Sequence, residues 1–251
     1  MLGVAAPSRL ETIDPRLSAH VRVALFVTCL VDTLFPQVGR ATVELLERLG
    51  VEVVFPRAQT CCGQLHRNAG YEREATALAR RYGEVFGGFD AIVTPSGSCA
   101  GHVRAHVPEL APEAAAAAAA TLELSEFLLG PLGVLDVRSG FVGSVAYHPT
   151  CHSLRVLGVG DGPERLLRAV PGLEFCALGE ATECCGFGGT FAVKNAAVST
   201  AMLDDKLEHV LATGAAAVCA CDSSCLMHIG GGLERRGIPV RALHLAEVLV
   251  S

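Results

Sequence analysis

The chain repeats itself, and this duplication limits the folds open to it more than any other feature of the sequence. Four blocks of residues occur twice, in the same order and at nearly constant spacing. The blocks and their second copies are 21–29 and 143–151, 59–63 and 182–186, 91–103 and 217–229, and 122–128 and 243–249. Internal similarity of this kind marks tandem structural units. We therefore expect a first repeat over 21–135, a second repeat over 140–251 and an N-terminal tail over 1–20.

Apolar periodicity within each repeat indicates strands that alternate with helices. Strands are predicted at 21–27, 51–55, 91–94, 143–147 and 215–219, and helices at 38–49, 71–86 and 196–213. This alternation is typical of the α/β class, so we predict two tandem pseudo-symmetric α/β repeats with mostly parallel sheets. Sites in such sheets gather at the carboxyl ends of the strands, where the repeated cysteines fall. The alanine run at 114–120 is predicted to form a surface helix added to the first repeat.

Eight of the eleven cysteines occur at matching positions of the repeated blocks, four in each copy. The first cysteine set is Cys29, Cys61, Cys62 and Cys99, and the second cysteine set is Cys151, Cys184, Cys185 and Cys225. Adjacent cysteines fit disulfide geometry poorly, whereas four thiolates from three strand-end loops can converge on one point. Each set therefore predicts one thiolate metal site, either four-coordinate zinc or an iron–sulfur cluster. Cys176 and Cys219 have no counterparts and are expected to be structural thiols.

Charge and hydropathy exclude several classes of protein. The net charge is −6 and no Lys/Arg-rich stripe occurs, which argues against a nucleic-acid partner. The apolar stretches, such as 23–31, are shorter than the ~18–20 residues of a transmembrane helix. Residues 1–20 lack the basic start and apolar middle of a signal peptide. With an odd number of cysteines, these features predict a cytoplasmic protein whose thiols serve metals or redox chemistry.

At these motifs the sequence resembles the CCG cysteine-rich domain family, which includes the cysteine-rich subunit of heterodisulfide reductase and the iron–sulfur subunit of glycolate oxidase. The most specific segments are ECCGFGGTF at 183–191, HPTCH at 148–152, TPSGSC at 94–99 and CLMHI at 225–229. The likeness is strongest to small two-repeat members that work with two partner proteins to oxidise L-lactate to pyruvate.

The resemblance implies an oxidoreductase subunit that transfers electrons through iron–sulfur clusters of the [4Fe–4S] type. It also implies a ferredoxin-like iron–sulfur partner subunit, a further protein of lactate utilisation, and a small 2-hydroxy acid as substrate of the complex. Zinc in one repeat is the alternative for the metal.

In the heterodisulfide reductase branch each motif ends in Cys-x-x-Cys. This chain departs from that pattern, because neither repeat has a cysteine three residues before the last cysteine of its set. The first repeat carries Ser96 at the position of the extra cysteine. The second repeat carries Cys221 four residues before Cys225, so Cys221 is a candidate fifth ligand. The cluster type therefore stays open, and the two centres can differ.

Four histidines flank the cysteine sets: His102, His148, His152 and His228. They either donate hydrogen bonds to a metal–sulfur group or serve in packing and helix capping. Two other functions also remain open. One is a zinc-stabilised interaction module without redox chemistry. The other is a thiol–disulfide reductase of the heterodisulfide reductase kind.

Overall fold

The computed structural model describes residues 22–251, so the tail predicted over 1–20 lies outside the described residues. The elements of the first repeat are β1 (Arg22–Leu25), α1 (Cys29–Leu34), α2 (Pro36–Arg48), β2 (Glu52–Val54), α3 (Gln64–Asn68), α4 (Glu72–Phe86), β3 (Ile92–Thr94), α5 (Gly97–Leu110), the 3-10 turn η2 (Pro112–Ala114), α6 (Ala115–Ala119), β4 (Thr121–Glu123) and α7 (Leu124–Leu129). The elements of the second repeat are β5 (Gly143–Tyr147), the π-helical turn η3 (Ser153–Leu157), α8 (Gly162–Arg168), β6 (Leu173–Cys176), α9 (Phe191–Lys194), α10 (Ala196–Ala212), β7 (Ala217–Ala220), α11 (Ser223–Arg235), β8 (Arg241–His244) and α12 (Leu245–Val250).

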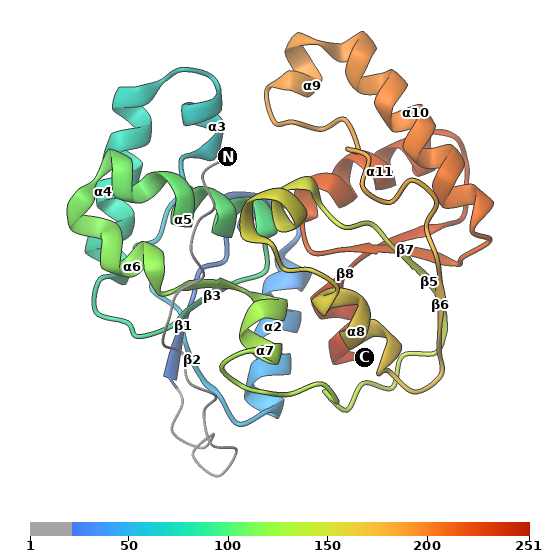
Figure 1. Ribbon diagram of the computed structural model, residues 1–251, viewed down its shortest axis with the longest axis horizontal. Helices are drawn as coiled ribbons and strands as arrows, with labels where there is room; N and C mark the ends of the chain where they lie inside the picture. The colour runs from blue at the N-terminus through green and yellow to red at the C-terminus, as the bar shows by residue number, and fades with distance from the viewer. Residues whose placement is uncertain (1–21) are drawn as a thin grey trace.

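Two four-stranded sheets form within residues 22–251, one in each repeat, and the repeats lie side by side (Figure 1). The strand orders are β2-β1-β3-β4 and β6-β5-β7-β8, and every neighbouring pair is parallel. The two sheets thus have the same topology. This arrangement confirms the predicted fold class of two tandem α/β repeats with parallel sheets. Among the helices of the described part of the chain, none has the length and apolar character needed to cross a membrane.

The first strand is shorter than predicted, because a side chain takes over its hydrogen bonding near Cys29. The strand predicted to end at residue 27 ends at Leu25. Gln59 then accepts a hydrogen bond from the Val27 N–H at 2.8 Å and donates one to the Leu25 carbonyl at 3.1 Å. The backbone is thereby satisfied while the chain leaves the sheet to begin α1.

The alanine run forms a helix at the surface, where Ala116 and Ala119 are exposed, but the opposite face of this helix is part of the core. Ala117 and Ala118 of α6 are buried and pack with the aromatic side chains of α4. The close approach depends on Gly83 of α4, since a Cβ atom there would lie 2.6 Å from the Cβ of Ala114. Small side chains therefore serve here as packing surface.

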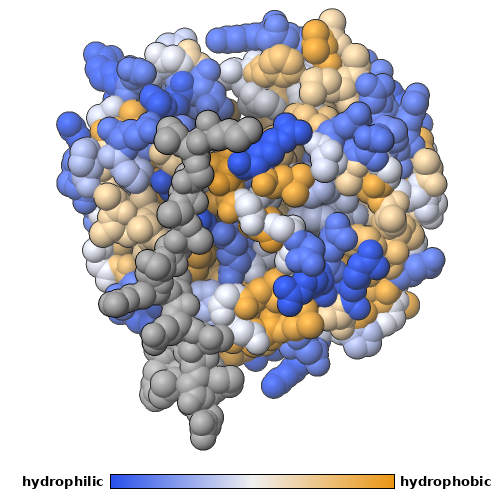
Figure 2. Space-filling model, in the orientation of Figure 1, coloured by the Kyte–Doolittle hydropathy of each residue, from blue (hydrophilic) through white to orange (hydrophobic). Residues whose placement is uncertain are grey.

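One cluster of buried apolar residues contains side chains from both repeats, and we call it the shared core. Its members include Leu45, Leu46, Leu124, Phe127 and Leu128 from the first repeat and Tyr147, Leu166, Leu167, Leu245, Val248 and Leu249 from the second. In this core α12 packs against α2, and α7 packs against α8 (Figure 1). Figure 2 shows hydrophobic residues also reaching the surface in the middle of this face, with hydrophilic residues around the periphery. The division of the chain into two repeats between residues 135 and 140 stays a prediction. The shared core contains residues from both sides of this division.

We expect Leu249→Ala to destabilise both repeats together. Leu249 is fully buried in the shared core on α12, and truncating a buried leucine costs about 2–5 kcal/mol of unfolding free energy. Urea unfolding followed by circular dichroism should show one transition at a lower midpoint. The matched control is Leu211→Ala, since Leu211 is 42% exposed on α10 and belongs to no buried cluster within residues 22–251, so its loss should change the free energy much less, by about 0.5 kcal/mol. Two separate transitions, with only one of them shifted, would contradict the shared core.

Candidate metal centres

The eight repeated cysteines line one cavity between the two repeats, with a volume of about 100 Å³. Cys29 is the first residue of α1, and Cys99 and Cys225 lie in the first turns of α5 and α11. The remaining five thiols come from the Cys-Cys-Gly turns that precede α3 and follow β6, and from the loop after β5. The cavity thus forms where loops and helix N-termini follow strands of both sheets, as expected for parallel sheets.

The Cys-Cys-Gly turns have the same conformation in both repeats. Gly63 and Gly186 have φ angles of +92° and +90°, a left-handed conformation that favours glycine. A Cβ atom on Gly186 would lie 2.6 Å from the Ser199 carbonyl oxygen. The N–H groups of Gly63 and Gly186 donate to the preceding thiols, Cys61 and Cys184, each over 3.4 Å. Glycine therefore allows both adjacent cysteines to face the cavity.

Within each set the thiols lie within contact of one another. In the first set, the Sγ atoms of Cys29 and Cys61 are 3.6 Å apart and those of Cys62 and Cys99 are 3.4 Å apart. In the second set, the Sγ atoms of Cys185 and Cys225 lie within 4.8 Å of each other, and Cys151 and Cys184 are close enough for each to shift the pKa of the other. The structure therefore brings together all four members of each predicted set. Metal binding by these eight residues stays a prediction.

One cysteine of each set is strongly acidic. The thiols of Cys29 and Cys151 donate to Cys61 and Cys184 respectively, and these hydrogen bonds, with others, lower the pKa of each acceptor to about 2. The same hydrogen bonds raise the pKa values of the donors, Cys29 and Cys151. Each set therefore holds one thiolate in place before any metal arrives, and metal binding must release the remaining protons.

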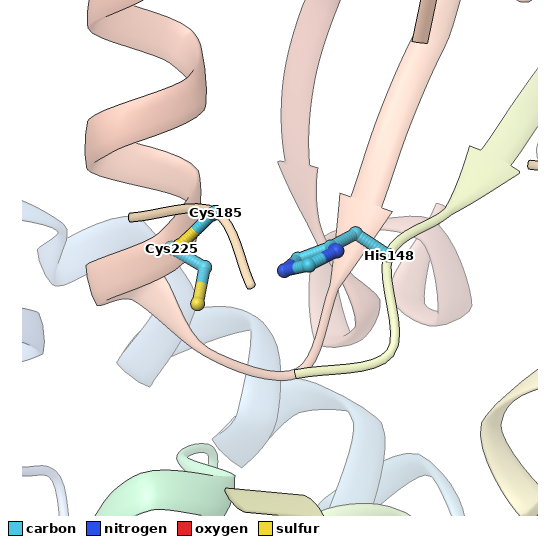
Figure 3. Close-up of side chains that lie close together, drawn as sticks. All are labelled: His148, Cys185 and Cys225. Atoms are coloured by element: carbon cyan, nitrogen blue, oxygen red, sulfur yellow. The ribbon is translucent and has the colours of Figure 1, made fainter. Parts of the chain in front are cut away.

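Two imidazoles beside the cysteine sets are buried without any hydrogen-bond partner. Both ring nitrogens of His102 and of His148 are unpartnered, and burial is the main cause that lowers the pKa of each to about 4. His148 comes from the loop after β5 and points toward Cys185 and Cys225, with the three ligand atoms within 4.8 Å of one another (Figure 3). A Cβ atom on Gly63 would lie 3.7 Å from Nε2 of His102, so that imidazole faces the turn of the first set.

These features fit an anionic metal–sulfur group. A neutral imidazole carries one N–H donor, and a buried donor without an acceptor costs about 1–3 kcal/mol. A metal–sulfur group held by four thiolates offers acceptor sulfurs to both His102 and His148. The donor set of each repeat therefore matches either an iron–sulfur cluster or zinc.

The other two histidines already have partners. Nε2 of His152 lies 3.0 Å from Nε2 of Gln64, and its Nδ1 lies 3.6 Å from the Cys151 Sγ. His152 therefore reaches from the second cysteine set to α3 of the first repeat. His228 is hydrogen-bonded to the Ser199 hydroxyl at 3.3 Å. Of the four predicted histidines, only His102 and His148 are left with unpartnered nitrogens facing a cysteine set.

The three remaining cysteines lie apart from the cavity lining. Cys221 is fully buried in the shared core, where its thiol lies 3.2 Å from the Tyr147 hydroxyl. Its role as a fifth ligand stays a prediction, and this position does not favour it. Cys219 is likewise buried in the shared core, and Cys176 ends the edge strand β6. These two positions agree with structural thiols.

Sequence reasoning missed Asp222, which ties the two sites together. Asp222 caps α11, and its carboxylate accepts hydrogen bonds from the Ser98 N–H at 2.7 Å and the Ser96 hydroxyl at 3.2 Å. Asp222 aligns with Ser96 in the duplication, and their backbones form an antiparallel bridge. Ser96 and Asp222 are the N-cap residues of α5 and α11, the helices that carry Cys99 and Cys225. The two repeats therefore touch at equivalent residues beside the two cysteine sets. The only signal in the sequence is an acidic residue at a helix start, which capping alone explains.

Comparisons with known proteins identify the repeats. The family model of the cysteine-rich CCG domain matches residues 23–104 and again residues 145–230. The chain is 48% identical over 235 residues to lactate utilization protein A of Geobacillus kaustophilus (strain HTA426), covering 91% of this chain and 98% of that protein. It is also 48% identical to lactate utilization protein A of Exiguobacterium sp. (strain ATCC BAA-1283 / AT1b), covering 90% and 96%. The similarity extends over both cysteine sets.

We expect the metal-free protein to be alkylated first at Cys61 and Cys184. Both pKa values are strongly lowered, so both side chains are thiolates at about pH 6, and the thiolate is the nucleophile. Cys176 is the internal control, because burial raises its pKa and keeps it protonated there. Anaerobic labelling with iodoacetamide and peptide mass spectrometry would measure the three rates. If Cys61, Cys184 and Cys176 were all labelled only as the pH approached the pKa of an ordinary thiol, the hydrogen-bonded thiolates would be contradicted.

Proposed function

Since the chain belongs to the family of CCG cysteine-rich domain proteins, we propose that it is an iron–sulfur redox subunit of an L-lactate-oxidising system. The observation that carries this proposal is that all eight cysteines of the two sets line a single cavity, with an unpartnered imidazole beside each set. The names of the relatives support lactate, or a similar small 2-hydroxy acid, as the substrate of the system.

The residues of each set have distinct tasks in this proposal. The four thiolates hold the group, and an iron–sulfur cluster supplies reversible one-electron transfer when bound. His102 and His148 donate hydrogen bonds to sulfur and remain neutral over the physiological range, because burial lowers their pKa values to about 4. Apolar side chains of the cavity wall, among them Leu65 and Phe187, limit the access of water. Reduced solvent access and sulfur hydrogen bonds both tune a cluster potential.

We extend the proposal to partners. The sequence contains no ferredoxin run of the form C-x2-C-x2-C-x3-C, so electrons must enter or leave through another protein. A ferredoxin-like iron–sulfur subunit and a further protein of lactate utilisation fill that need. Docking over the shared cavity would keep the transfer distance short for both cysteine sets.

Zinc in the second repeat is the second candidate, and one observation favours it. The ligand atoms of His148, Cys185 and Cys225 lie within 4.8 Å of one another, which suits the mixed nitrogen and sulfur ligands of a structural zinc site. In that case the second repeat would be a stabilising module, and only the first would carry redox chemistry. Metal analysis separates the two candidates.

The direct test is anaerobic purification with quantitation of iron, acid-labile sulfide and zinc. We expect iron with matching sulfide and a broad absorption band near ~400 nm. Colourless protein with about two equivalents of zinc would overturn the redox proposal. Iron in one set and zinc in the other would favour the mixed alternative.

Substitution of one thiol in the first set should remove one centre and spare the other. We expect Cys62→Ser to lose about half of the iron and sulfide, because Cys62 is buried in the first set and four ligands are needed for each cluster. Cys176→Ser is the matched control and should keep the full content, since Cys176 does not line the cavity. Circular dichroism would establish that both variants are folded. Full iron content in folded Cys62→Ser would exclude Cys62 as a ligand.

A further inference from the structure

The two cysteine sets repeat each other, but one residue behind them does not. The turn at Gly63 packs against Leu78 of α4, and the turn at Gly186 packs against Met202 of α10. Helices α4 and α10 therefore correspond, and four residues further along each helix Tyr82 stands opposite Lys206. A neutral aromatic residue in the first repeat is thus replaced by a cation in the second.

Tyr82 is packed among apolar side chains, and its hydroxyl has a hydrogen-bond partner. Its ring packs edge-on against Phe26, with ring centroids 5.2 Å apart. Its hydroxyl is hydrogen-bonded to the Thr121 hydroxyl at 2.6 Å. Burial raises the pKa of Tyr82 far above the physiological range, so this position adds no charge to the first site.

Lys206 is fully buried, which is unusual for a lysine. The sequence contains only one other lysine, Lys194, which is exposed on α9. Nζ of Lys206 donates to the Glu180 carbonyl at 2.8 Å, although an ammonium group has three donors. Burial lowers the pKa of Lys206, and the charges of Glu183, Cys185 and Cys184 oppose that shift. The cation is therefore held in place by the anionic environment of the second cysteine set.

Other charges do not cancel this difference between the sites. Near the first set, Arg67 is partly exposed and paired with Glu72 and Glu109. Asp222 lies at the junction and accepts hydrogen bonds from both repeats, so it acts on both sites. Glu183 is half-exposed, and solvent and salt screen such a charge more than a buried one.

The unpartnered imidazoles also do not distinguish the sites. Each set has one buried imidazole with both ring nitrogens unpartnered, His102 for the first and His148 for the second. The unpartnered imidazoles are therefore balanced between the repeats, and the second set has in addition His152, whose Nδ1 lies 3.6 Å from the Cys151 Sγ. The buried charge of Lys206 remains as the difference in charge.

We propose that Lys206 tunes the second centre, so that the group held by the second cysteine set is reduced more readily than the group held by the first. Reduction adds one negative charge to the group, and a nearby buried cation stabilises that charge. An electron shared between the two centres would then reside on the second repeat. This inference rests on the proposed iron–sulfur function.

The test is an anaerobic redox titration of the loaded full-length protein, followed by electron paramagnetic resonance. We expect two potentials, of which the higher belongs to the centre that remains in Cys62→Ser. Lys206→Met should lower that potential alone, with at least a tenfold fall in the ratio of reduced to oxidised centre at a fixed potential, which is 59 mV for a one-electron couple. Lys206→Arg keeps the charge and should restore most of the shift. Lys194→Met removes the same charge from the surface and should shift neither potential.

Several results would overturn the inference. A single potential for both centres in the unmodified protein, or a lower potential for the centre that remains in Cys62→Ser, would do so without any lysine variant. An unchanged or raised potential in folded Lys206→Met would also do so. Iron and sulfide content separates this result from failure of the proposed function. Protein without iron would contradict both the proposed function and the inference. Two loaded centres of equal potential would contradict the inference alone.

Discussion

The structure depends on the packing of each repeat's last helix against the other repeat. In the shared core α12 of the second repeat lies against α2 of the first, and α7 of the first lies against α8 of the second. This reciprocal packing sets the orientation of the two sheets. Because sites in parallel sheets form at the carboxyl ends of the strands, both Cys-Cys-Gly turns then open on the same cavity. Each repeat therefore supplies a wall of the other's site, and the two centres are neighbours as a result of the fold.

Local patterns in the sequence predict much of this architecture. The helix expected at 196–213 is found at Ala196–Ala212, and the duplication alone predicts that the two sheets share one topology. The left-handed turns at Gly63 and Gly186 are equally local, because each depends on a glycine directly after the two cysteines. Membership of each cysteine set follows from the same local repeat.

What the sequence does not predict depends on contacts between distant residues. Burial of Ala114, at the start of the alanine run, requires the absence of a side chain at Gly83, on a different helix. The contact of Asp222 with Ser98 depends on how the repeats face each other. Lys206 is one charged residue in a helix whose other acidic and basic residues are mostly exposed, so no periodicity separates it from a solvated lysine. The helices and strands could be predicted from local patterns. The packing of the two repeats against each other, and the burial of charged residues that results from tertiary packing, could not.

The buried charge at Lys206 also bears on why the two repeats differ. Removing a charge from water costs several kcal/mol unless an opposite charge or good hydrogen bonds compensate. The first repeat shows that a neutral tyrosine fills the equivalent position and satisfies its hydroxyl, so packing alone does not require a cation there. One carbonyl acceptor at 2.8 Å is poor compensation for an ammonium group. The compensation comes from nearby negative charge, that of Glu183 first and that of the second cysteine set after it. By the same attraction, Lys206 stabilises further negative charge on a group that this cysteine set holds.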